Sequence, residues 1–142
     1  MYSDSQELKC YKDILYPTSF ISFFTFLFAI YLKLYFLAIV PLLVGLTSII
    51  HWYNPKDDIY RKCDILIVFI STIYFSIISI KYNVKIYFLI IFFSVIFYLL
   101  SFYFINKKDY KKSAFIHSLI HIFGNIGNIF FFIIIYNILI NN

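Results

Sequence analysis

Long apolar segments alternate with short polar ones along this chain. Apolar residues fill four stretches, at about 14–53, 64–80, 86–105 and 113–140, and the polar interruptions between them are YNPKDDIYRKC, KYNVK and NKKDYKK. About 20 apolar residues in a helix suffice to cross the hydrocarbon core of a bilayer. Each of the last three stretches therefore predicts one transmembrane helix.

The first stretch is too long for a single span. Its forty residues are interrupted only by Lys33, and one continuous helix of that length would measure about 60 Å, twice the hydrocarbon thickness. We therefore expect two helices joined by a tight turn near Lys33. The sequence predicts an all-α, polytopic membrane protein, in which a polar cytosolic tail (1–13) precedes a single transmembrane domain (14–142). Its bundle of about five helices comprises spans at about 14–32, 34–52, 64–80, 86–105 and 113–140.

The composition supports this class. Hydrophobic residues make up 63% of the chain and charged residues only 13%, whereas globular domains carry about 25% charged residues. The excess of basic residues does not indicate nucleic-acid binding, because these residues lie in short loops between apolar stretches. Cys10 and Cys63 fall on the same predicted side of the membrane, which argues against a structural disulfide. The lipid bilayer is the predicted partner, and a second copy of the chain is left open.

The loop charges predict the orientation. With five spans, nine of the twelve Lys and Arg residues lie on the side of the N-terminal tail, and only Lys33, Lys81 and Lys85 lie on the other. By the positive-inside rule the N-terminus is cytosolic and the C-terminus is not. The tail has no small-residue cleavage site, so we expect the first span to be retained. The pattern does not indicate which membrane holds the protein.

All three histidines fall near this cytosolic face. His117 and His121 are four residues apart at the start of the last span, so their Cβ atoms should lie about 5 to 6 Å apart. His51 ends the second span and Asp64 opens the third. Three imidazoles with a carboxylate or a water form the tetrahedral shell that Zn²⁺ prefers. The sequence therefore predicts a zinc site of His51, His117, His121 and Asp64, with Cys63 as a less favoured ligand.

Further polar residues lie on the faces of these histidines. Thr47 and Ser48 precede His51 by four and three residues, where a hydroxyl could orient a water or stabilise an oxyanion. Asn125 and Asn128 continue the stripe of the histidine pair. They could bind a substrate carbonyl or satisfy polar atoms inside the bundle.

Together these residues resemble the pattern shared by alkaline ceramidases and by the progestin and adipoQ receptors with their haemolysin III relatives. The resemblance implies an intramembrane zinc and hydrolysis of lipid amide or ester bonds. It assigns His51, His117 and His121 as zinc ligands, Asp64 as fourth ligand or water-holding base, and Ser48 as the supporting catalytic hydroxyl. The cytosolic N-terminus is similar to the receptor branch. The chain departs from these families in having five predicted spans where they have seven, and in having Thr47 at the position of the family serine.

Simpler interpretations stay open beside this one. The histidines could be interfacial polar residues, His51-Trp52-Tyr53 part of an aromatic belt, and Asp64 an ion-pair partner of Arg61 or Lys62. The alternative function is then a non-enzymatic membrane scaffold or assembly protein in which the polar cluster only fixes helix packing. A channel or transporter lined by the His and Asn stripe is a third, weaker possibility.

Overall fold

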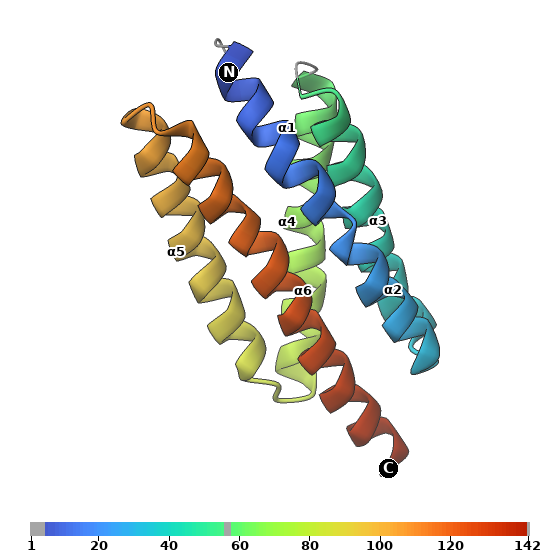
Figure 1. Cartoon of the computed structure of the whole chain (residues 1–142). Helices are drawn as coiled ribbons and strands as arrows, with labels where there is room; N and C mark the ends of the chain where they lie inside the picture. Colours follow the sequence, from blue (N-terminus) through green and yellow to red (C-terminus); the bar gives the residue numbers. More distant parts are fainter. Residues whose placement is uncertain (1–4, 56–57, 142) are drawn as a thin grey trace.

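The computed structural model describes residues 5–55 and 58–141, and these residues fold into helices joined by short turns (Figure 1). No strand occurs among them. The six helices are α1 (Ser5–Ser19), α2 (Ile21–Tyr31), α3 (Tyr35–Tyr53), α4 (Asp58–Lys81), α5 (Ile86–Asn106) and α6 (Tyr110–Ile140).

Helices α1 and α2 form one membrane-length unit, Leu8–Tyr31, that is interrupted at Phe20. Pro17 lies in the last turn of α1 and cannot donate a backbone hydrogen bond. The Ser19 hydroxyl donates back to the Leu15 carbonyl at 2.8 Å, a side-chain bond that bends helices. With this pair counted as one, five segments of the described chain are long and apolar enough to cross a membrane. The prediction of an all-α bundle of about five such helices is confirmed.

The first helix begins earlier than the sequence predicts. Residues 1–13 are predicted to form a polar tail, but α1 starts at Ser5. The physical reason is tertiary packing: Tyr11 and Leu15 are buried against Trp52 and Ala114. Likewise α4 starts at Asp58 and α6 at Tyr110, so part of each polar interruption is helical.

Three helix ends share one turn geometry. In each, a residue with positive φ is followed by a residue whose N–H donates to a carbonyl five positions back, which is the Schellman motif. The left-handed residues are Lys33, Asn83 and Lys108, with φ of 59°, 55° and 58°. The bonds are Leu34 N to Ala29 O, Val84 N to Ser79 O and Asp109 N to Phe104 O, at 2.9, 2.8 and 3.0 Å. The chain therefore reverses at Lys33 without Gly, Pro or Asn at the turn.

Helix α6 packs against α1, α2 and α5, and helix α3 packs against α1, α2 and α4. We name the end of the bundle that holds the first turns of α1, α4 and α6 and the last turns of α3 and α5 the N-terminal end (Figure 1). Aromatic rings fill the core toward the opposite end, where Phe75 contacts Tyr87, Phe131 and Phe132. The candidate site residues lie toward the N-terminal end.

Candidate functional site

Asp64 is tied to helix α3 by two hydroxyl groups. Ser48 Oγ donates to Asp64 Oδ1 at 2.6 Å, and Thr47 Oγ1 donates to the same oxygen at 2.9 Å. Both donors lie on the His51 face of α3, as the sequence spacing predicts, and Asp64 is half-buried on the facing helix α4. Its second oxygen, Oδ2, accepts no hydrogen bond from the described residues. Among the described residues, the carboxyl group is thus held through one oxygen.

The two hydroxyls do not hold Asp64 equally. The Thr47 hydroxyl also lies 3.1 Å from the Leu43 carbonyl and 3.2 Å from the Val44 carbonyl. One hydroxyl hydrogen serves one acceptor well at a time, whereas Ser48 has the shortest bond to Asp64 and no competing acceptor among the described residues. Ser48 is therefore the stronger of the two partners.

No Lys or Arg of the described chain lies within ion-pair distance of Asp64. The neighbouring Lys62 pairs instead with Asp58, at 2.8 Å and one helical turn away. The interpretation of Asp64 as an ion-pair partner of Arg61 or Lys62 thus finds no support in these contacts. What compensates the burial of this carboxyl group is the pair of hydroxyls from α3.

His51 lies inside the bundle with one ring nitrogen unsatisfied. Its side chain is 2% exposed, and Nδ1 has no hydrogen-bond partner among the described residues. Leaving a buried polar atom unpaired costs about 1–3 kcal/mol. Such an atom is unusual in a folded protein and is the kind of position where a ligand or a metal ion is expected.

The other two histidines lie on successive turns of α6. Their ring centroids are 5.8 Å apart. The ring of His117 also contacts Tyr98 of α5, at 6.4 Å, and Trp52 of α3, at 5.8 Å. The Trp52 ring that His117 contacts also contacts His51. The indole thus connects the histidine of α3 with the pair on α6.

Trp52 lies at the centre of this group. Its ring centroid is 4.2 Å from that of His51 and 5.8 Å from that of His117, and on another side it stacks on Tyr11 at 5.8 Å. The indole is 3% exposed. Because the same indole touches both imidazoles, it forms part of the wall of any site that they share.

The residue types in this region suit a divalent metal ion. Their side chains are not, however, arranged as a complete set of metal ligands. Three imidazoles and a carboxylate are suitable zinc donors, and the bare Nδ1 of His51 fits such a role. However, no three His, Cys, Asp or Glu side chains of residues 5–55 and 58–141 converge closely enough to hold an ion. His117 and His121 are neighbours on α6, while the ring of His51 lies against Trp52. The zinc site stays a prediction.

Asn125 is engaged in packing rather than open to a ligand. It is 6% exposed; its Oδ1 accepts from the Thr25 hydroxyl at 2.7 Å, and its Nδ2 donates to the His121 carbonyl at 2.7 Å and to Ser22 Oγ at 3.3 Å. The bonds with Thr25 and Ser22 join α6 to α2. Of the two roles weighed for Asn125, the contacts favour satisfaction of polar atoms within the bundle, and Asn128 is half-buried one turn beyond.

A second polar cluster at the N-terminal end was not predicted. The Tyr11 hydroxyl bonds to Ser113 Oγ, which also lies 2.9 Å from Ser101 Oγ and donates to the Ser101 carbonyl at 2.8 Å. The cluster joins α1, α5 and α6. The four-residue spacing of Tyr11 and Leu15 is compatible with a helix, but only the structure shows that both side chains are buried.

Cys63 is exposed beside Asp64, and Cys10 is half-buried on α1; both are free thiols. Neither belongs to a three-ligand group among the described residues.

Comparisons with protein-family models, with characterised proteins and with solved structures found no match for this chain. The site is therefore interpreted from its own residues.

Proposed function

We propose that this multi-pass membrane protein is a zinc-dependent hydrolase that cleaves amide or ester bonds of lipids. The observation that carries the proposal is the carboxyl group of Asp64, which Ser48 and Thr47 hold through one oxygen at the end of the bundle where all three histidines lie. A carboxyl group fixed in this way, at the same end of the bundle as three imidazoles, supports a metal-assisted hydrolytic site.

Each residue has a distinct role in the proposed reaction. His51, His117 and His121 would hold the zinc, which when bound polarises a carbonyl and lowers the pKa of water to about 7. Asp64 would act as the general base and accept the proton of the attacking water at Oδ2. Ser48 and Thr47 would keep the carboxylate in position and, when a substrate is bound, could turn a hydroxyl toward the developing oxyanion.

The proposal includes an orientation. Eight of the eleven Lys and Arg residues that the structure describes lie in the segments of the N-terminal end, so we place this end on the cytosolic side. The candidate site would then lie just beneath the headgroups of the inner leaflet. A lipid could present its amide or ester linkage, which lies at that depth, without leaving the bilayer.

The first test is the metal content of the purified full-length protein. Elemental analysis should find about one zinc per chain, and His51→Ala, His117→Ala and His121→Ala should each lower that content strongly, because three-ligand sites rarely survive the loss of one ligand. Cys63→Ser is the matched control and should retain zinc, since this thiol is exposed and outside the proposed shell. Full zinc in all three histidine variants would refute the proposal.

The second test is turnover of a panel of ceramides and glycerolipids. Asp64→Asn should abolish hydrolysis in protein that still melts at the normal temperature, because the amide keeps the shape of the side chain but cannot take the proton. Zinc-loaded protein that hydrolyses none of the panel would contradict the enzymatic part of the proposal.

The contacts also favour a second candidate, a membrane scaffold whose polar groups only lock the helices together. Asn125 and the cluster of Tyr11, Ser101 and Ser113 are engaged in bonds between helices. For a scaffold with structural zinc, chelation should unfold the protein, because structural zinc sites can contribute 10 kcal/mol or more to folding. For the hydrolase, chelation should stop turnover while most of the helical signal remains.

A further inference from the structure

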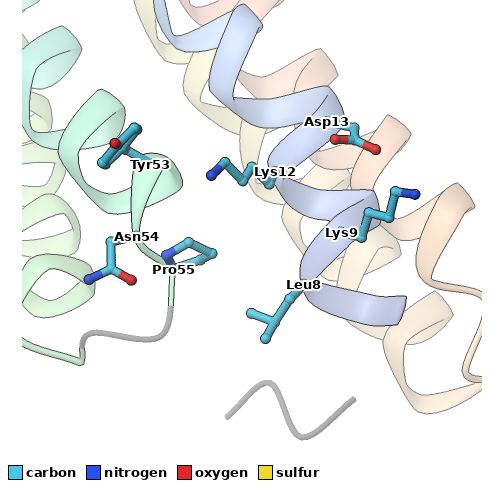
Figure 2. A pocket seen from close by; sticks show the side chains of 7 residues that line it. All are labelled: Leu8, Lys9, Lys12, Asp13, Tyr53, Asn54 and Pro55. Atoms are coloured by element: carbon cyan, nitrogen blue, oxygen red, sulfur yellow. The ribbon is translucent and has the colours of Figure 1, made fainter. Parts of the chain in front are cut away.

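A groove opens at the N-terminal end of the bundle, between the first turns of α1 and the end of α3 (Figure 2). Its volume is about 360 Å³. Leu8 and Pro55 give it apolar walls, and Lys12, Tyr53 and Asn54 give it polar groups. We infer that this groove binds the phosphate-bearing headgroup of an anionic membrane lipid. The inference does not depend on the hydrolase.

The position of the groove favours a lipid headgroup. Leu8 is the first residue of one membrane-length apolar segment, and Tyr53 is the last residue of the next. The groove therefore lies where the apolar part of the bundle ends, at the level where lipid phosphates are found. Its volume suits a headgroup with the start of the glycerol backbone and is too small for a complete lipid.

Lys12 supplies the charge for a phosphate. In Figure 2 its side chain points from α1 toward Tyr53, and its Nζ lies 5.0 Å from the centre of the Tyr53 ring. No carboxylate of the described residues forms an ion pair with Lys12 or with Lys9. At the same end of the bundle, by contrast, Lys62 and Lys112 each pair with an aspartate, at 2.8 and 2.9 Å. Among the described residues, the Lys12 ammonium contacts the face of the Tyr53 ring, and none of their carboxylates compensates its charge.

The other residues of the groove make Lys12 necessary for the binding of an anion. Lys9 and Asp13, which also line the groove, cancel each other's charge, so the net positive charge of the lining is that of Lys12. Helix α3 ends at the groove, and the last carbonyls of a helix carry partial negative charge. A phosphate could bind beside them only with a cation in the groove, while the Asn54 amide can donate a hydrogen bond to it. Binding should therefore depend on Lys12 and not merely on the general charge of this end.

Native mass spectrometry of the full-length protein in neutral detergent tests the inference. We expect phosphatidic acid and phosphatidylserine to bind more tightly than phosphatidylcholine. Lys12→Gln should weaken the binding of phosphatidic acid about five-fold, the equivalent of ~1 kcal/mol for one basic residue. Lys12→Arg should keep it, because the positive charge remains.

Two matched variants distinguish the groove from diffuse attraction. Lys62→Gln removes a charge at the same end but outside the groove, and Lys33→Gln removes one at the turn between α2 and α3, so both should bind phosphatidic acid as the unaltered protein does. A loss with Lys62→Gln equal to that with Lys12→Gln would overturn the inference. So would displacement of the lipid by inorganic phosphate at millimolar concentration, because the groove would then be a site for free anions.

Discussion

At the scale of single residues, the two hydroxyls on Asp64 should contribute unequally to stability. Ser48 donates over 2.6 Å and has no competing acceptor among the described residues, whereas the Thr47 hydroxyl is shared with two backbone carbonyls. Ser48→Ala should lower the free energy of unfolding by about 1–2 kcal/mol, and Thr47→Val by less than about 1 kcal/mol. Unfolding of both variants in detergent, followed by circular dichroism, checks this order, and equal losses would contradict it.

Asp109 provides a pH-dependent contribution at the start of α6. Its side chain accepts a hydrogen bond from the Lys112 backbone N–H at 3.2 Å and pairs with the Lys112 ammonium at 2.9 Å. The ammonium of Lys112, together with that backbone bond, holds the pKa of the Asp109 carboxyl below its ordinary value. Since the folded state favours the charged form, the stabilisation is present above the ordinary carboxyl pKa and is lost as the pH falls through the lowered one.

Asp109→Ala should therefore lower the melting temperature at neutral pH and have little effect in strong acid. The N-cap bond is lost in the variant at every pH, but in acid the unaltered protein has lost most of it as well. Melting curves of the two proteins at neutral and strongly acidic pH provide the measurement. A difference that stays constant across this range would show that the charge of Asp109 does not matter.

At the scale of elements, replacing Gly124 or Gly127 of α6 by alanine should change the stability of the protein in opposite directions. A Cβ at Gly127 would lie 2.5 to 2.9 Å from three side-chain atoms of Ile90 on α5, while a Cβ at Gly124 would meet nothing within 4 Å. Gly127→Ala should destabilise the bundle by about 1–3 kcal/mol through overpacking. Gly124→Ala should stabilise it by up to about 1 kcal/mol through helix propensity. Thermal unfolding of the two variants side by side tests the α5–α6 contact.

Apolar runs and their lengths were sufficient to predict the helices, because crossing a bilayer imposes a minimum length. The turn at Lys33 followed from length alone, since its local residues give no turn signal; a Schellman motif places a lysine in the left-handed region there and again at Lys108. The start of α1 was not predicted, because the charged residues around Tyr11 make this segment look like a polar tail. In the structure the Tyr11 ring is buried, and its partners lie on α3 and α6. Such contacts are decided by tertiary packing.

Helical spacing likewise predicted part of the candidate site. The periodicity of α3 places Thr47 and Ser48 on the face of His51, and both bond to Asp64 in the structure. Periodicity cannot give the rotation of a side chain about its own bonds. The contact of Trp52 with His51 and His117 depends on such rotations in two helices, so the sequence could assign Trp52 only to an aromatic belt.

At the scale of the whole molecule, the proposed orientation can be tested through Cys63. This thiol is exposed near the start of α4, at the N-terminal end, and Cys10 can be replaced by serine to leave it as the single target. In intact cells a membrane-impermeant maleimide should leave Cys63 unmodified, and it should label Cys63 once the cytosolic face is opened. Labelling in intact cells would reverse the orientation and place the candidate site on the outer side.

Trp52 is the only tryptophan of the chain, and it touches rings of both helices that bring histidines to the candidate site. Its fluorescence therefore reports on that region without any label. We expect blue-shifted emission from an indole that is 3% exposed. Zinc binding to His51, whose ring centroid lies 4.2 Å from that of the indole, should change its intensity, and the change should be absent in His51→Ala. One spectroscopic signal could then follow the assembly of the centre in real time, in whatever lipid or detergent surrounds the protein.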